Sequence, residues 1–154
     1  MNLIASLVLS SVVPGLAAAE VSWETLKLDD KFYSEGGAIA DINKDGKMDI
    51  VSGPFWYEGP DFKARHEIYE AKAVDPHGYS DVFLQFAPDV NGDGWPDVLI
   101  YGWPGKGGWW LENPKGGTAA WVKHPIIDVV DGESPAFTDL YCRARRFVES
   151  WFVA

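Results

Sequence analysis

Two stretches of the chain place side-chain oxygens at the spacing of a cation-binding loop. Counted from the first aspartate of each stretch, positions 1, 3, 5 and 9 carry a carboxylate or an amide. These residues are Asp41, Asn43, Asp45 and Asp49 in the first stretch, and Asp89, Asn91, Asp93 and Asp97 in the second. Because alternate positions of a tight loop point inward, we expect the oxygens of each stretch to converge.

The remaining loop positions suit the same chemistry. Position 6 is glycine in both stretches, Gly46 and Gly94, which permits the sharp turn that brings the later oxygens round. Position 7, Lys47 or Trp95, can offer its main-chain carbonyl whatever its side chain. Ca²⁺ accepts about six to eight oxygens with tolerant geometry, whereas Mg²⁺ demands stricter octahedral order and Zn²⁺ prefers His or Cys. The sequence therefore predicts one Ca²⁺ site at each loop.

Plain hairpin turns are the alternative interpretation, because Asn-Gly and Asp-Gly pairs favour such turns without any ion. The recurrence of all four donor positions favours cation binding. An EF-hand is excluded, because its bidentate acid stands at position 12, where this chain has Ser52 and Ile100. The flanking segments are also typical of strands rather than helices.

The elements that must hold these loops belong to a repeat of about 48 or 49 residues. The two loops begin 48 residues apart, at Asp41 and Asp89. A shift of 98 residues, which is two periods of 49, lays residues 23–41 on residues 121–139 with five identities. Repeats of this length are typical of propellers, solenoids and arrays.

Short β-branched or aromatic segments, separated by Gly, Pro, Asn and Asp, predict an all-β fold. The expected strands lie at residues 37–41, 49–53, 55–59, 66–70, 82–89, 97–102, 109–113 and 123–130. About four strands per repeat matches a propeller blade. We therefore expect a partial β-propeller with about two four-stranded blades and the start of a third.

These segments resemble the FG-GAP and VCBS repeat families, in which an apolar strand runs into D-x-[DN]-x-D-G-x-x-D and a second short strand. The matching stretches are "GGAIADINKDGKMDIV" at 36–51 and "FAPDVNGDGWPDVLI" at 86–100. The resemblance extends over about residues 23–139. It implies β-propeller blades with calcium in the loops between strands, in exported or cell-surface proteins, and the eight oxygen-bearing residues above as calcium ligands.

The beginning of the chain indicates export. Residues 1–19 contain no charged side chain, and their apolar run gives way to a Pro-Gly break and then to three alanines. This pattern predicts a signal peptide cleaved after Ala19 and a secreted, periplasmic or cell-surface location. A membrane anchor is the alternative, although the run is short for a spanning helix.

The repeats occupy residues 20–140, and residues 141–154 depart from their pattern. A third loop begins at Asp139, but Tyr, Arg and Phe stand at its positions 3, 5 and 9. We interpret this tail as a frameshifted or a divergent end. Cys142 is the only cysteine, so no intramolecular disulfide can hold the loops, and bound calcium would serve that purpose.

The charge of the chain narrows the choice of partners. The sequence has 13 basic and 23 acidic residues, giving a formal net charge of −10. Such a balance disfavours nucleic acid and anionic membranes, and it suits a cation or a neutral molecule such as a carbohydrate. The expected partners are calcium and a carbohydrate or a cell-surface protein. No segment after residue 19 is long and apolar enough to cross a bilayer.

Aromatic residues offer a second kind of contact. Trp103 and Trp109 lie in a Gly-rich stretch, where their rings could stack on a sugar. Four other tryptophans recur in register, and we expect them in the core: Trp23, Trp56, Trp110 and Trp121. His66 and His124 also recur, which indicates a structural role.

The chain carries no G-x-S-x-G, H-E-x-x-H, phosphate-loop or dinucleotide motif. The sequence thus favours a non-catalytic, exported, calcium-binding module for binding or adhesion. The alternative is a fragment of a carbohydrate-active enzyme, of the polysaccharide lyase or sugar dehydratase type.

Overall fold

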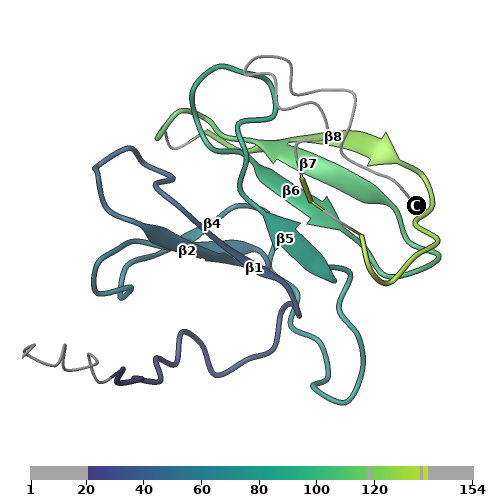
Figure 1. Cartoon of the computed structure of the whole chain (residues 1–154), viewed down its shortest axis with the longest axis horizontal. Coiled ribbons are helices and arrows are strands. Elements are labelled where there is room, and N and C mark those ends of the chain that lie inside the picture. The colour runs from purple at the N-terminus through teal and green to yellow at the C-terminus, as the bar shows by residue number, and fades with distance from the viewer. Residues whose placement is uncertain (1–20, 118, 136, 139–154) are drawn as a thin grey trace, which may run out of the picture.

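The computed structural model describes residues 21–117, 119–135 and 137–138, and in these residues the fold is all-β with no helix (Figure 1). Two four-stranded antiparallel sheets follow one another along the chain, each with its strands in sequence order. The first sheet comprises β1 (Gly37–Ala40), β2 (Asp49–Ser52), β3 (Phe55–Tyr57) and β4 (Arg65–Glu67). The second comprises β5 (Leu84–Phe86), β6 (Val98–Tyr101), β7 (Gly108–Glu112) and β8 (Val122–Ile127).

The all-β prediction is therefore confirmed, and each of the eight expected segments overlaps a strand. Seven of the eight strands are shorter than expected, and β7 has the expected five residues. The predicted signal peptide at 1–19, the residue Asp139 and the tail at 141–154 lie outside the described residues. Within the described chain, no helix has the length and apolar character needed to cross a bilayer.

The hydrophobic core lies between the two sheets. Its buried side chains come from both: Ile42, Val51 and Ile68 from the first half, and Val82, Val98, Ile100 and Leu111 from the second. Strand register explains this arrangement, because directly opposed residues share a face of a sheet. Val51, for example, pairs with Ala38 on β1 and Trp56 on β3, and both neighbours pack against the core.

The sheets meet along β1 and β5 (Figure 1). The Glu35 N–H donates to the Val82 carbonyl at 3.2 Å. Gly36 allows the close approach, because a Cβ there would lie 2.7 Å from the Gln85 nitrogen. Gln85 itself accepts the Gly53 N–H at 2.9 Å and donates to the Gly53 carbonyl at 3.0 Å, so a side chain of the second sheet completes a turn of the first.

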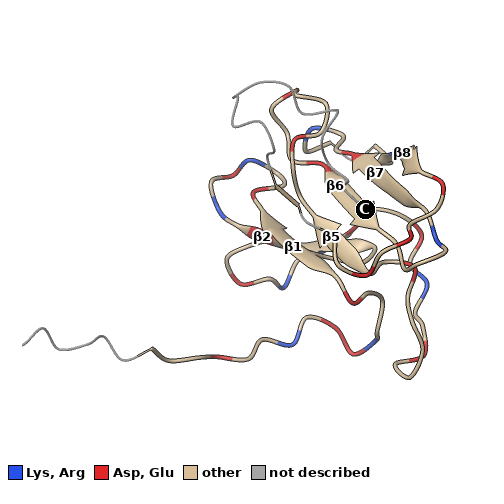
Figure 2. Ribbon diagram, turned by 45° about the vertical axis from the view of Figure 1, so that its right-hand side comes forward, with Lys and Arg blue, Asp and Glu red and all other residues tan. Residues whose placement is uncertain are grey.

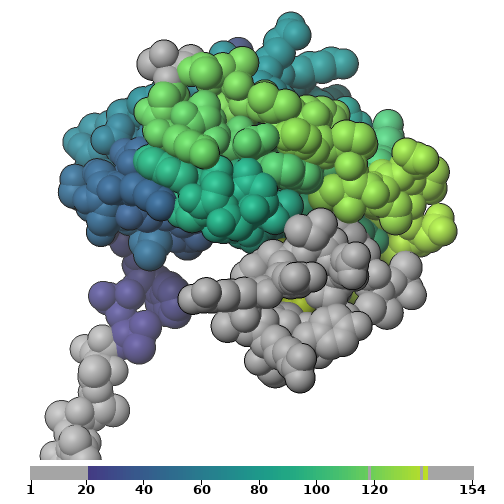
Figure 3. All heavy atoms as spheres, turned by 90° about the horizontal axis from the view of Figure 1, so that it is seen from above, coloured from purple at the N-terminus to yellow at the C-terminus, as the bar shows by residue number. Residues whose placement is uncertain are grey.

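The tryptophans expected in the core divide into two groups. Trp56 and Trp121 pack against the core, and Trp110 is half-buried against His124. Trp23 is 92% exposed, so its assignment to the core was wrong. In Figure 3 the purple N-terminal part of the described chain projects from the margin of the packed body.

Candidate metal centre

Each acidic stretch is the loop between the first two strands of its sheet. The first loop, Asp41–Asp49, joins β1 to β2, and the second, Asp89–Asp97, joins β5 to β6. Figure 2 shows Asp and Glu residues concentrated in the connections between strands. The fold thus places the two predicted sites at equivalent points of the two sheets.

Side-chain oxygens at the first positions of each loop fold the main chain around themselves. In the first loop, Asp41 accepts the Asp45 N–H at 3.0 Å and the Gly46 N–H at 2.9 Å. The Asn43 carbonyl oxygen accepts the same Asp45 N–H at 3.1 Å, and Asp45 in turn accepts the Lys47 N–H at 2.9 Å. Positions 1, 3 and 5 therefore all direct an oxygen toward the loop's own main chain.

The second loop repeats this pattern bond for bond. Asp89 accepts the Asp93 N–H at 3.0 Å and the Gly94 N–H at 2.7 Å. The Asn91 oxygen lies 3.0 Å from the Asp93 nitrogen, and Asp93 accepts the Trp95 N–H at 2.9 Å. The same four hydrogen bonds therefore hold both loops.

Position 9 has a different role, because its carboxylate is fully buried in both loops. Asp49 accepts the Ile42 N–H at 2.8 Å with one oxygen and the Gly59 N–H at 2.8 Å with the other. The carboxylate thus closes the loop at position 2 and ties it to the turn that follows β3.

In the second loop, Asp97 makes the matching bonds to the N–H groups of Val90 and Asn113, each at 2.9 Å. From the sequence, Gly59-Pro60 and Asn113-Pro114 are turn-forming pairs that follow Trp-x-Glu at the same place in each repeat. The sequence did not predict that Gly59 and Asn113 donate to the carboxylate at position 9.

The two loops lie next to each other. The Asn113 amide donates to the Ile42 carbonyl at 3.0 Å and to the Pro96 carbonyl at 2.8 Å, so one side chain joins both loops. The Lys44 ammonium of the first loop lies 4.7 Å from the centre of the Trp95 ring in the second. The predicted sites are therefore neighbours in space.

Each carboxylate at position 5 has an ammonium group beside it. The Lys47 Nζ lies 3.1 Å from an Asp45 oxygen, and the Lys115 Nζ lies 3.2 Å from an Asp93 oxygen. The N–H and ammonium of Lys47 lower the pKa of Asp45. Burial acts to raise the pKa of Asp93, but the Trp95 N–H and Lys115 outweigh it and lower the pKa. Both carboxyls are therefore ionised at neutral pH.

Asp97 behaves in the opposite way. Burial raises its pKa, although the N–H groups of Asn113 and Val90 oppose the shift, and the charge of Asp93 raises it further. The fold therefore penalises the negative charge of this carboxylate. A cation within the loop would relieve that penalty.

The carboxylate and amide oxygens of each loop are the donor types that a hard cation prefers. Each carboxylate oxygen has two lone-pair directions, and one main-chain N–H uses only one of them. Within the described residues, no group of three or more Asp, Glu, His or Cys side chains is gathered closely enough to hold a metal. Each loop would thus need its amide and main-chain oxygens, including the predicted carbonyls of Lys47 and Trp95, to complete the coordination.

Trp103 and Trp109, the two residues predicted to contact a sugar, both pack against other side chains. The Trp103 ring lies between Tyr79 and Phe83, at centroid distances of 4.3 and 4.0 Å. Its buried indole N–H has no hydrogen-bond partner among the described residues. Trp109 packs against the core, with the Lys123 ammonium 3.9 Å above its ring.

The two recurring histidines occupy matching positions on the outer strands. His66 stacks on Trp56 at 4.0 Å, and its Nε2 lies 3.1 Å from a Glu58 oxygen. In the second sheet, His124 stacks on Trp110 at 4.3 Å, and its Nε2 lies 2.9 Å from a Glu112 oxygen.

We compared the chain with protein-family models, with curated proteins and with solved structures, and none of the three comparisons found a match.

Proposed function

We propose that this chain is an exported, non-catalytic binding module of β-propeller type, stabilised by one Ca²⁺ in each acidic loop. The observation that carries the proposal is the exact recurrence of the loop: six hydrogen bonds in the first loop have counterparts between the same positions in the second. Positions 1, 3, 5 and 9 thereby hold their oxygens in the same way twice.

The packing of the sheets supports blades of a propeller. Both sheets have the same strand order, and the first strand of one lies beside the first strand of the other. After β8 the chain returns toward β5, where Phe137 stacks on Phe86 at 4.4 Å. This return is what a third blade beginning beside the second would require. A closed ring needs about four to eight blades, so two sheets represent part of one.

Bound calcium would stabilise each acidic loop. Three carboxylates in nine residues repel one another, and a divalent ion would offset that repulsion while joining the two strands at the loop. In an extracellular setting, where calcium is plentiful, even weak loops of about 10⁻⁴–10⁻³ M affinity are useful. The partner of the module would be a carbohydrate or a cell-surface protein.

Calorimetric titration of the full chain with Ca²⁺ tests the proposal. We expect two ions per chain, and one ion after either Asp45→Ala or Asp93→Ala, because each removes a ligand from one loop. The matched control is Asp61→Ala, whose exposed carboxylate pairs with Lys63 at 3.1 Å outside the loops. No calcium-induced heat and no change in unfolding at millimolar Ca²⁺ would overturn the proposal.

Terbium luminescence tests both loops. Tb³⁺ replaces Ca²⁺ at oxygen sites and is excited by a nearby tryptophan, and Trp95 lies in the second loop and beside Lys44 of the first. We expect sensitised emission that Trp95→Phe reduces and that Asp45→Ala and Asp93→Ala each lower in part. Emission unaffected by all three variants would place the ions elsewhere.

A further inference from the structure

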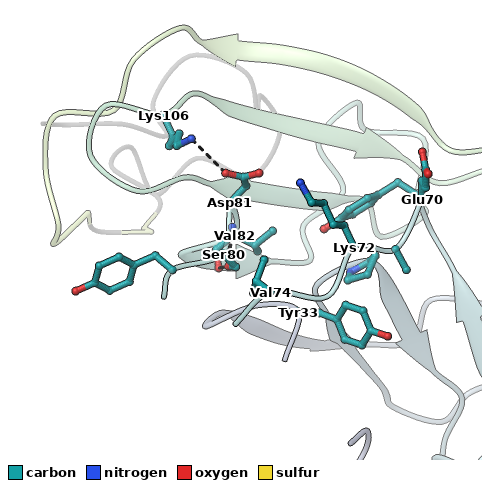
Figure 4. Close-up of a pocket in the computed structure, with 12 residues that line it drawn as sticks. Tyr33, Glu70, Lys72, Val74, Ser80, Asp81, Val82 and Lys106 are labelled. Atoms are coloured by element: carbon teal, nitrogen blue, oxygen red, sulfur yellow. Dashed lines mark hydrogen bonds and ion pairs between the residues drawn. The ribbon is translucent and has the colours of Figure 1, made fainter. Parts of the chain in front are cut away.

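A cavity of about 670 Å³ lies between the two sheets (Figure 4). Its walls come from the turn between β2 and β3, from the connection between β4 and β5, and from the turn between β6 and β7. All of these lie at the end of the strands opposite the acidic loops. The volume is within the range of small-molecule sites, about 300–1,000 Å³.

The charges lining the cavity balance. The lining includes two acids, Glu70 and Asp81, and two bases, Lys72 and Lys106. The Lys106 ammonium lies 3.4 Å from an Asp81 oxygen, as the dashed line in Figure 4 shows. In a chain with a formal net charge of −10, this neutral lining neither attracts a cation strongly nor compensates for the repulsion of an anion.

Tyrosines supply the rest of the polar surface. Tyr33, Tyr69 and Tyr79 all line the cavity. Burial, together with the negative charge of Asp81, raises the pKa of Tyr69, so its hydroxyl stays protonated and can both donate and accept. The wall therefore offers hydroxyl, carboxylate and ammonium groups around partly apolar rings.

Tyr79 is the most accessible of these rings, at 74% exposure. One part of it is held against Trp103 at 4.3 Å, and Trp103 is held in turn by Phe83 at 4.0 Å. The Tyr79 ring thus has one contact with Trp103 while most of its surface stays open to solvent, so a ligand can reach it.

We propose that this cavity binds an uncharged sugar. The exposed face of Tyr79 stacks on the C–H face of the sugar ring, while the Asp81 carboxylate and the Tyr69 hydroxyl accept its hydroxyl protons. Lys72 donates to the sugar oxygens. A purely apolar ligand would take the Tyr69 hydroxyl and the Lys72 ammonium out of water without offering either a partner, and a charged ligand would upset the balance of the lining.

Saturation-transfer NMR and calorimetry on the full chain test the assignment. The probes are uncharged hexoses and their disaccharides, together with the corresponding uronates. We expect binding of at least one uncharged sugar, with an affinity about tenfold weaker after Asp81→Asn, because a hydrogen bond to a charged acceptor is lost. Tyr79→Ala should weaken it by a similar factor, whereas Tyr79→Phe keeps the stacking surface and should retain it.

The matched control is Asp61→Asn, which alters an exposed aspartate–lysine pair far from the cavity lining and should leave the affinity unchanged. Circular dichroism and urea unfolding confirm that each variant folds. The proposal is overturned if no uncharged sugar binds, or if binding persists in both Asp81→Asn and Tyr79→Ala. Preference for a uronate that depends on Lys72 would also overturn it, because the cavity would then be an anion site.

Discussion

Replacing Asp97 with alanine would remove the acceptor that closes the second loop. Both oxygens of this fully buried carboxylate are in use, one by the Val90 N–H and the other by the Asn113 N–H, at 2.9 Å each. Alanine accepts neither hydrogen bond, and the space it leaves is enclosed. We therefore expect a loss of stability even when no calcium is present.

The size of the loss follows from these two contacts. A buried donor left without a partner costs about 1–3 kcal/mol. The Asn113 N–H is buried and should lose this amount, whereas the Val90 N–H is only partly buried and should lose less, because water can reach it. Removing a charge that burial penalises offsets part of the sum. We expect about 2–4 kcal/mol, out of a total of about 5–15 for an ordinary domain.

Urea unfolding followed by tryptophan fluorescence, in EDTA and in excess Ca²⁺, measures this effect. Asp93→Ala is the comparison, because Asp93 has 19% of its side chain exposed and pairs with Lys115 at 3.2 Å. In EDTA it should cost less than about 1 kcal/mol. Calcium at 100 times its Kd should stabilise the native chain by about 2.7 kcal/mol per site, and each variant should lose the contribution of its loop.

One outcome would refute the reasoning. If Asp97→Ala unfolds within about 0.5 kcal/mol of the native sequence in EDTA, the buried carboxylate is not the acceptor that holds the loop closed. A large loss for Asp93→Ala in EDTA would likewise contradict the division of roles between positions 5 and 9.

Three further outcomes are expected. Gly36→Ala should lower the free energy of unfolding by about 1–3 kcal/mol, because its Cβ would lie 2.7 Å from the Gln85 nitrogen. Gly78→Ala is the control and should not lower it, because no atom lies nearer than 3.5 Å to the added Cβ. Urea unfolding compares the two variants. Asn113→Ala should lower the free energy of unfolding by about 1–3 kcal/mol, because its side-chain amide donates to a carbonyl of each loop. Calorimetry should then show weaker calcium binding in both loops, and an effect on the second loop alone would contradict this reasoning. Burial raises the pKa of Tyr69, so its contribution to the free energy of unfolding is present below about pH 10 and is lost as the pH rises above that value. Between about pH 8 and 11 the free energy of unfolding of Tyr69→Phe should therefore depend less on pH than that of the native sequence. An unchanged pH dependence would argue against a buried phenol.

Loop spacing and strand pattern were readable from the sequence because both are local. Short apolar runs after Asp49 and Asp97 predict strands, and glycine at position 6 of each loop predicts the turn. The different role of position 9 was not readable, because its partners at Gly59 and Asn113 come from a turn two strands away. Only the folded sheet brings those N–H groups to the carboxylate.

Burial of the tryptophans shows the same limit. Trp23 and Trp121 match in register, but only Trp121 packs against the core, because burial depends on which sheet lies opposite. The cavity was also not foreseen. Its walls are connections without periodic pattern, and residues such as Tyr33 and Lys106 come together only when the two sheets pack.

The outermost strands of the two sheets resist intermolecular strand addition. All three residues of β4 are exposed, and they are Arg65, His66 and Glu67, whose charged or polar side chains discourage pairing with the β-strand of another molecule. The other outer strand, β8, contains Pro125, which has no N–H to offer an incoming chain. Lateral growth of the sheets into fibrils is thereby disfavoured, and association between copies would have to use the faces of the sheets instead.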